Sequence, residues 1–293
     1  MRWLSLITVC VLATTAAAAN KKLLLITHSG GFIHDSVGLA EDILKEIGPK
    51  HGYDVTCWRY TGDTTDAKFA KYKDDFRKRT QKAIEPENCG RINKHTLKSF
   101  DAVLFFTTGG GPKKGNLSPL TLTELEDLQA WVKAGGAFTG THCASDTMYE
   151  TTYGELIGGY FKTHPQIQEV TLKLEDPKHP AAAGMTDGMK WTDEYYIMTQ
   201  QPYDRSKLHI ILSINKDTFK FKDAKAQATQ GRADGDYAVS WTKEYGTGKV
   251  FYTSLGHRKE VWQDERFQQH LFGGIDWATG KKPGEKAPSQ QKR

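Results

Sequence analysis

The residues of this chain that could do chemistry are histidines placed directly after apolar, strand-like segments. His28, His142 and His257 each follow such a segment. In a parallel sheet the carboxyl ends of the strands meet at one edge, and ligands bind there. We therefore expect these three imidazoles to reach a single shared cleft.

His142 has the most informative surroundings. The segment Phe138 to Ala144 runs from a predicted strand into a tight turn with small neighbours, which is the layout of a nucleophile elbow with a strained backbone. Histidine is a poor hydrolytic nucleophile but a good acid, base or metal ligand. Cys143 comes one position later and is expected to point inward. The alternative is that His142 is only a packed, hydrogen-bonded side chain.

Three further residues complete the predicted catalytic set. Gly256 precedes His257 and allows the backbone to approach a ligand closely; the alternative is a loop histidine in water. Asp146 is expected to hydrogen-bond His142 or to cap the next helix. Glu194 belongs to a carboxylate pair beside two tyrosines, a combination that suits sugar hydroxyls and the apolar face of a pyranose, or else forms an acidic surface pair.

The other candidates are assigned to ligand binding or to a metal. Ligand binding is predicted for His28, His34, Asp35, Gly109, Gly110, His164 and Tyr195. The glycine-rich turn lacks the Lys-Ser/Thr of a P-loop and the spacing of a dinucleotide fingerprint, which excludes nucleotide binding, but its N–H groups could hold a hydroxyl. His28, His142 and His257 could also converge on Zn²⁺ with one position open for water, although no close-spaced ligand pair supports this.

The order of apolar and amphipathic segments predicts an α/β fold. A continuous apolar run at Lys22 to Thr27 indicates a strand buried on both faces. A helix after Asp35 and a strand from Tyr53 complete a βαβ unit. Further strands are expected over residues 101–107, 137–141, 167–174 (at a sheet edge), 208–214, 237–241 and 249–254, and helices over 66–84, 118–134 and 266–278. This alternation predicts a flavodoxin-like, doubly wound, mostly parallel sheet with helices on both faces.

Residues 1–19 have the pattern of a cleavable signal peptide. Arg2 supplies the positive region, an apolar stretch of ten residues follows, and Ala17 and Ala19 fit the rule for cleavage before Asn20. The stretch is too short to span a bilayer, which needs about 20 residues. We expect an exported protein, periplasmic or extracellular, that does not span the membrane.

The charge of the mature chain argues against nucleic acid as a partner. Of the formal net charge of +5, Arg2 contributes +1 and the tail over 281–293 contributes +4, so the body is neutral. We expect one domain over residues 20–280 and a disordered basic tail over 281–293. Of the three cysteines left after cleavage, Cys57 and Cys89 are the pair expected to form any disulfide.

Several segments together resemble the trehalose-utilisation (ThuA-like) family. They are His28 to Ser36, Phe105 to Gly110, Gly135 to His142, Tyr153 to Phe161, His164-Pro165, Asp193 to Tyr196, Gly256-His257 and Gly273 to Ala278. They occur in family order over roughly residues 22–280. The resemblance implies a fold like that of class I glutamine amidotransferases and a role in disaccharide use through oxidised (3-keto) sugars.

The chain also departs from these patterns. The amidotransferases use Cys at the elbow and a His-x-Glu on a later strand, whereas this chain has His142 at the elbow and Lys259 in place of the Glu. The resemblance therefore implies no glutamine hydrolysis. Ile33 stands where a basic residue is common, Cys143 where alanine is usual, and the charged segment 66–84 looks like an insertion with a solvated basic face.

Three functions stay open at this point. The first is an enzyme that modifies a small-molecule carbohydrate (a hydrolase, isomerase or lyase) by histidine acid–base chemistry. The second is a metal-assisted hydrolase with a His-ligated zinc. The third is a non-catalytic carbohydrate-binding protein, because pocket histidines, acids and aromatic rings serve binding equally well. The sequence indicates no oligomeric state.

Overall fold

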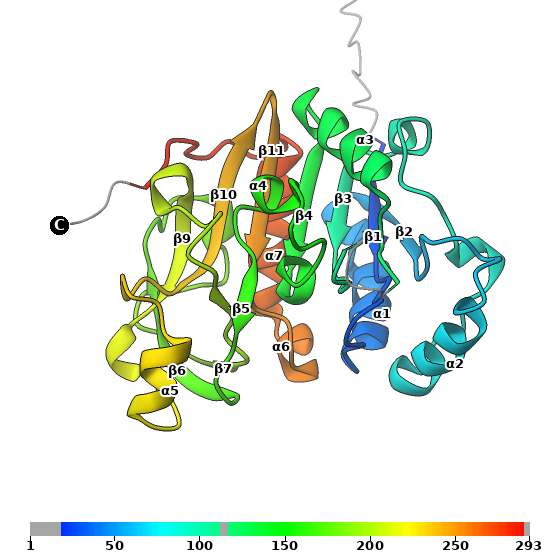
Figure 1. Ribbon diagram of the computed structural model, residues 1–293. Helices are drawn as coiled ribbons and strands as arrows, with labels where there is room; N and C mark the ends of the chain where they lie inside the picture. Colours follow the sequence, from blue (N-terminus) through cyan, green and yellow to red (C-terminus); the bar gives the residue numbers. More distant parts are fainter. Residues whose placement is uncertain (1–18, 112–116, 290–293) are drawn as a thin grey trace, which may run out of the picture.

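A computed structural model describes residues 19–111 and 117–289 of the chain. Its centre is a nine-stranded sheet with the order β2-β1-β3-β4-β11-β10-β9-β6-β7 (Figure 1). The expected signal peptide lies outside the described residues except for Ala19. Within the described ranges, no helix is long and apolar enough to cross a membrane.

One half of the sheet is parallel. It consists of β2 (Tyr53–Trp58), β1 (Lys21–Ile26), β3 (Ala102–Phe105), β4 (Ala137–Thr141) and β11 (Gly248–Thr253). Both faces of the central strands are covered, and every residue of β3 and β4 is buried. The predicted α/β fold with a large sheet is confirmed.

The other half is antiparallel. It contains β10 (Ala238–Tyr245), β9 (His209–Ile214), β6 (Gln168–Leu174) and β7 (Lys190–Asp193). The segment predicted as an edge strand, β6, instead lies between β9 and β7. The edge strand on this side is β7, which has only four residues. A separate pair joins β5 (Phe161–Thr163) to β8 (Ile197–Met198).

Helices cover both faces of the sheet. In Figure 1, α1 (Val37–Ile47) and α7 (Glu265–Ala278) lie behind it, and α3 (Leu122–Lys133) and α4 (Tyr153–Ile157) lie in front. The expected helices over 66–84 and 118–134 are α2 (Phe69–Thr80) and α3. The short helices α4, α5 (Ala224–Gln230) and α6 (Lys259–Gln263) were not predicted, because five to seven residues give little periodicity.

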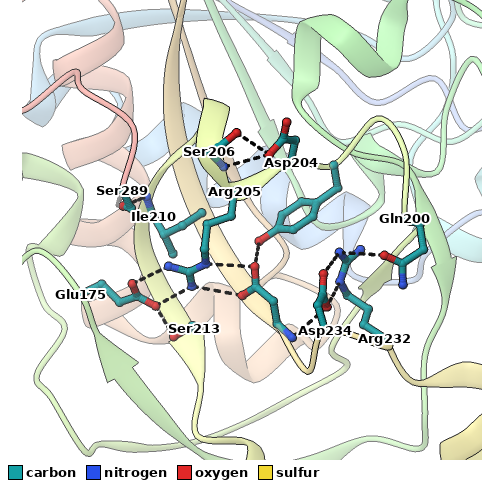
Figure 2. Close-up of polar contacts among 12 residues, drawn as sticks. Glu175, Gln200, Asp204, Arg205, Ser206, Ile210, Ser213, Arg232, Asp234 and Ser289 are labelled. Carbon is teal, nitrogen blue, oxygen red and sulfur yellow. Dashed lines mark hydrogen bonds and ion pairs between the residues drawn. The ribbon is translucent and has the colours of Figure 1, made fainter. Parts of the chain in front are cut away.

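A partly buried ion-pair network braces the antiparallel half (Figure 2). Arg205 donates to both carboxylate oxygens of Glu175, at 2.8 Å each, and to Asp236 at 2.9 and 3.1 Å. Ser213 also donates to Glu175 at 2.6 Å. A polar cavity of about 640 Å³ opens beside these residues, but its charged groups already bond one another.

The sequence predicts a disordered tail from residue 281, but hydrogen bonds hold part of the segment 281–289 in place. Ser289 N donates to Leu208 O and Ile210 N donates to Ser289 Oγ, both at 2.8 Å, and His209 Nδ1 lies 2.8 Å from Ala287 O. The sequence suggested disorder because lysine and proline dominate this segment, but backbone bonds to the start of β9 hold it. Residues 290–293 lie outside the described part of the chain.

The expected Cys57–Cys89 disulfide is absent from the structure. Both thiols are free, and Cys57 is buried 3.6 Å from the hydroxyl of Thr27. Cys89 donates instead to Glu85 O.

Arg205→Ala is expected to destabilise the fold by about 1–3 kcal/mol, because it leaves the partly buried carboxylates of Glu175 and Asp236 without their charged partner. Denaturant unfolding would measure the loss. Lys207→Ala, which alters an exposed ion pair with Asp204 on the same turn, is the matched control and should be nearly neutral. Equal stability of the Arg205 variant and the parent protein would contradict this role.

The fold is also expected to lose stability in mild acid. Burial lowers the pKa of His28 to about 3 and those of His179 and His270 to about 4. These imidazoles stay neutral in the folded state while the unfolded chain takes up protons below about pH 6.5. The free energy of unfolding is therefore highest, with respect to these groups, above about pH 6.5. It falls as the pH is lowered toward 4, by about 1.4 kcal/mol per pH unit for each histidine.

Urea unfolding at pH 6.5, 5.8 and 5.0 measures that slope. His270→Gln should reduce the slope by roughly one histidine's share, about 1.4 kcal/mol per pH unit. An unchanged slope in this variant would show that His270 does not remain neutral when buried.

Candidate metal centre

Four side chains from distant parts of the chain meet at one point. His34 lies on the loop between β1 and α1, His142 directly follows β4, and Glu194 directly follows β7. His257 lies between β11 and α6. One ligand atom from each lies within 4.8 Å of all the others, and we term these four residues the His₃Glu cluster.

His142 is at the middle of the cluster. Its Nε2 lies 3.2 Å from His34 Nε2, 3.2 Å from His257 Nδ1 and 3.5 Å from Glu194 Oε2. His257 Nδ1 is also 3.4 Å from Glu194 Oε2. The structure thus brings together His142 and His257, whose convergence the sequence predicted.

These spacings fit a shared metal ion. Two ligand atoms that each lie about 2.1 Å from one ion, at an angle of about 90–110°, are about 3.0–3.4 Å apart. Three imidazole nitrogens and a carboxylate oxygen are a donor set suited to zinc and similar transition ions. His142 Nδ1 donates to Ser254 O at 2.9 Å, and this bond leaves Nε2 as the ligating nitrogen.

The backbone at His142 has the strain expected of an elbow. Its φ is +43°, a left-handed conformation that costs a non-glycine residue roughly 1–2 kcal/mol. The Tyr252 hydroxyl donates to His142 O at 2.8 Å, and the Thr141 hydroxyl donates to Leu255 O at 2.8 Å. These bonds from and to the neighbouring β11 segment hold the turn in place.

Cys143 lies inside the protein, as expected. It is completely buried, and burial raises the pKa of its thiol well above the ordinary value. A thiolate nucleophile is therefore unfavourable here.

Asp193 positions the loop that carries His257. Its two carboxylate oxygens accept hydrogen bonds from Gly256 N at 2.8 Å and Arg258 N at 3.2 Å. Gly256 has a φ of +116°, which glycine adopts readily. Burial raises the pKa of Asp193 to about 6 despite these bonds. The sequence pointed to the carboxylate pair but did not separate this role from that of Glu194.

Tyr196, rather than Tyr195, lies on the cluster side. The Tyr196 ring is 4.3 Å from the His142 ring, whereas the Tyr195 hydroxyl donates to Trp191 O at 2.7 Å and is buried away from it. Alternate residues of an extended chain face the same side, so Tyr196 accompanies Glu194. The assignment of Tyr195 to ligand binding is corrected on this ground.

His28 is not a member of the cluster, which corrects its predicted metal role. Its ring is completely buried between Tyr60 and Tyr72, at centroid distances of 4.7 and 5.1 Å, and Nδ1 lies 2.8 Å from the Thr61 hydroxyl. These contacts hold the His28 ring against Tyr60, Tyr72 and Thr61 and away from His142. His34, six residues later, returns to the strand ends after the loop has turned.

The glycine-rich turn is not available as predicted. Gly109 N donates to Asp146 O at 3.2 Å, and Gly109 O accepts from Met148 N at 2.7 Å. Gly110 beside it is buried.

Asp146 does not orient His142 as predicted. Its carboxylate accepts from the Tyr149 hydroxyl at 2.6 Å, and the acceptor that orients the His142 ring is the backbone carbonyl of Ser254.

Two predicted ligand-binding residues lie at the solvent side of the cluster. His164 Nδ1 is 3.1 Å from Glu194 Oε1 and 2.8 Å from Pro165 O, and its side chain is 41% exposed. Asp35 pairs with Lys259 at 3.3 Å. By contrast, His142 is completely buried, so a ligand reaches the cluster from the side of His164 and His257.

Burial sets the charge of the cluster. Burial, with the neighbouring imidazoles, lowers the pKa of His34 well below its ordinary value and that of His257 to about 4. Burial alone would raise the pKa of Glu194, but its contacts with the imidazoles of His142, His257 and His164 outweigh burial and hold the pKa below the ordinary value. Neutral imidazoles beside an ionised carboxylate are the protonation states that bind metal.

The sequence model of the trehalose-utilisation (ThuA) family matches residues 22–278. The chain belongs to this family. No curated protein matches its sequence. A ThuA-like protein from Bacteroides uniformis has a similar fold, with a TM-score of 0.59, 16% identity and coverage of 95% of this chain and 99% of the other. A ThuA-like protein from Parabacteroides merdae gives 0.59 and 17%, with coverage of 92% and 93%.

In this ThuA-family protein, Asp193→Asn is expected to weaken zinc binding by about 10- to 100-fold, the usual effect of losing an outer-shell partner. The variant keeps the shape of the side chain but loses one of the two acceptors that hold the loop of His257. Competition with a chromophoric chelator would measure the affinity. Asp217→Asn, on the surface, is the control, and equal affinities would contradict the positioning role.

Proposed function

We propose that this ThuA-family protein binds zinc or a similar divalent ion at the His₃Glu cluster and acts on a sugar-like ligand by metal-assisted acid–base chemistry. The carrying observation is the convergence of three other ligand atoms on His142 Nε2, at 3.2, 3.2 and 3.5 Å. The other proposals in this subsection depend on that geometry.

Hydrogen bonding alone leaves the cluster incomplete. A carbonyl oxygen only accepts, so the proton of neutral His142 is on Nδ1 and Nε2 offers a single lone pair. That lone pair can accept from His34 or from His257, but not from both. A bound cation would use all three facing nitrogens at once.

The ion would act as a Lewis acid toward a carbonyl or hydroxyl oxygen of the ligand. The chain's own part is the transfer of protons at the mouth. His164 donates through Nδ1 to acceptors on Pro165 and Glu194, so its Nε2 is left to take up or release a proton. With a ketone in the ligand, such a base can remove the acidified neighbouring proton, as isomerisation or elimination requires.

The family description supplies the ligand class. The matching model is named for trehalose utilisation, and we infer that the ligand is a disaccharide or a keto-sugar. The cluster and its surroundings combine three ionisable groups with an aromatic ring, namely Glu194, His164, His257 and Tyr196. This mixture suits a hydroxyl-rich molecule.

The decisive experiment measures metal and turnover together. Protein purified without a nickel column should contain about one zinc per chain by elemental analysis, in line with the one such cluster found among the described residues. His142→Ala should lose the metal and at least a thousandfold of turnover on a panel of disaccharides and their 3-keto forms, read by mass spectrometry.

His179→Ala is the matched control, since it removes a buried histidine outside the cluster and should keep its zinc. Turnover that persists in metal-free protein would favour acid–base chemistry by histidine alone. Ligand binding with no product from any sugar would favour a carbohydrate-binding protein. Either result would overturn the proposed metal-assisted reaction.

A further inference from the structure

We propose that Phe32 and Arg79 form a pyranose subsite beside the His₃Glu cluster, in which a sugar ring stacks on Phe32 and Arg79 donates to its hydroxyls. This inference rests on the proposed function, because it assigns the ligand's ring to the mouth of that same site. It adds two recognition residues. Phe32 lies on the loop between β1 and α1, and Arg79 lies on α2, which follows β2.

Phe32 is an exposed aromatic ring in direct contact with the cluster. Its side chain is 55% exposed, although large apolar side chains are mostly buried in the described chain. Its ring meets that of His34 edge-on, with centroids 4.9 Å apart and planes at 76°. A ligand stacked on Phe32 would therefore lie one ring away from the His34 nitrogen that faces His142.

The backbone under Phe32 is fixed even though the ring is exposed. Gly30 N donates to Thr108 O at 2.8 Å, and Gly31 N donates to Thr108 Oγ1 at 3.2 Å. The same hydroxyl donates to Phe32 O at 2.9 Å. Because Thr108 is buried, the loop presents the ring in a set position, which lowers the ordering cost of binding.

Arg79 completes the platform from a separate helix. Its Nε donates to Ile33 O at 3.1 Å, and its guanidinium carbon lies 5.2 Å from the centre of the Phe32 ring, within the range of a cation–π contact. No carboxylate pairs with Arg79 among residues 19–111 and 117–289. The guanidinium lies over one face of the Phe32 ring, so a stacked sugar would use the opposite face and accept from the remaining N–H groups of Arg79 around the edge of the ring.

Arg79 comes from α2, the charged segment that looked like an insertion with a solvated basic face. Arg77 and Lys78 on the same helix are exposed, as that interpretation expects. Arg79 differs because it reaches the loop that carries His34. The insertion therefore contributes a side chain that contacts the loop of His34.

The combination of groups identifies the ligand by its chemistry. A pyranose has a flat face of C–H groups, which stacks on an aromatic ring, and a rim of hydroxyls, which accept from a guanidinium. An acyclic polyol offers the hydroxyls without the flat face, and a free phosphate would use Arg79 alone. The Phe32–Arg79 pair together favours the cyclic sugar.

The test titrates zinc-loaded protein with trehalose, methyl α-D-glucopyranoside, sorbitol and inorganic phosphate, followed by NMR. Both pyranosides should bind, and sorbitol should bind more weakly. Phe32→Ala and Arg79→Ala should each raise the Kd for the pyranosides about tenfold or more, whereas Phe32→Trp should retain binding. Zinc content should stay unchanged in all three variants.

Leu122→Ala and Arg77→Ala are matched controls, because Leu122 is 53% exposed and Arg77 is exposed on the same helix as Arg79. Pyranoside affinity that survives Phe32→Ala, or a parent protein that binds no pyranoside, would overturn the subsite. Phosphate binding that is lost in Arg79→Ala but kept in Phe32→Ala, without pyranoside binding, would also overturn it. Loss of zinc in the parent protein would refute the proposed function separately.

Discussion

The parallel alignment of β1, β4 and β11 is the constraint on which the site depends. Parallel neighbours end at the same edge of the sheet, and these strands lie within four positions of one another in the order β1-β3-β4-β11. Their following loops therefore converge without any special sequence, and each delivers one imidazole. Reversing the direction of any one strand would move its histidine to the opposite end of the molecule.

The antiparallel half of the sheet supplies the one carboxylate of the cluster, whereas the parallel half supplies the three imidazoles. β7 is at the far edge of the sheet, yet Asp193 at its end bonds Gly256 N next to His257. In Figure 1, β7 and α6 lie at the same end of the molecule. Glu194 thus adds its carboxylate to three imidazoles, of which those of His34 and His142 are buried. The ion-pair network around Arg205 joins Glu175, which follows β6, the neighbour of β7, to Ser213 on β9.

The elbow shows how one backbone geometry can serve different chemistry. A left-handed residue at the end of a strand projects its side chain past the sheet, and here that residue is His142, with a φ of +43°. The bonds to Ser254 and Tyr252 fix both its ring and its carbonyl. A ring fixed on one nitrogen is preorganised to bind through the other, while the neighbouring thiol of Cys143 stays buried.

The sequence by itself determined the order of the main strands and helices, the elbow at His142 and the candidacy of Glu194 and His257. These follow from local patterns, namely hydrophobic periodicity and polar residues at strand ends. Only the tertiary structure decided that His34 joins the cluster instead of His28, that Tyr196 faces it instead of Tyr195, and that Arg79 reaches Phe32. Each of those choices depends on which way a loop turns and which face of an extended segment is covered, and packing between segments far apart in the chain sets both.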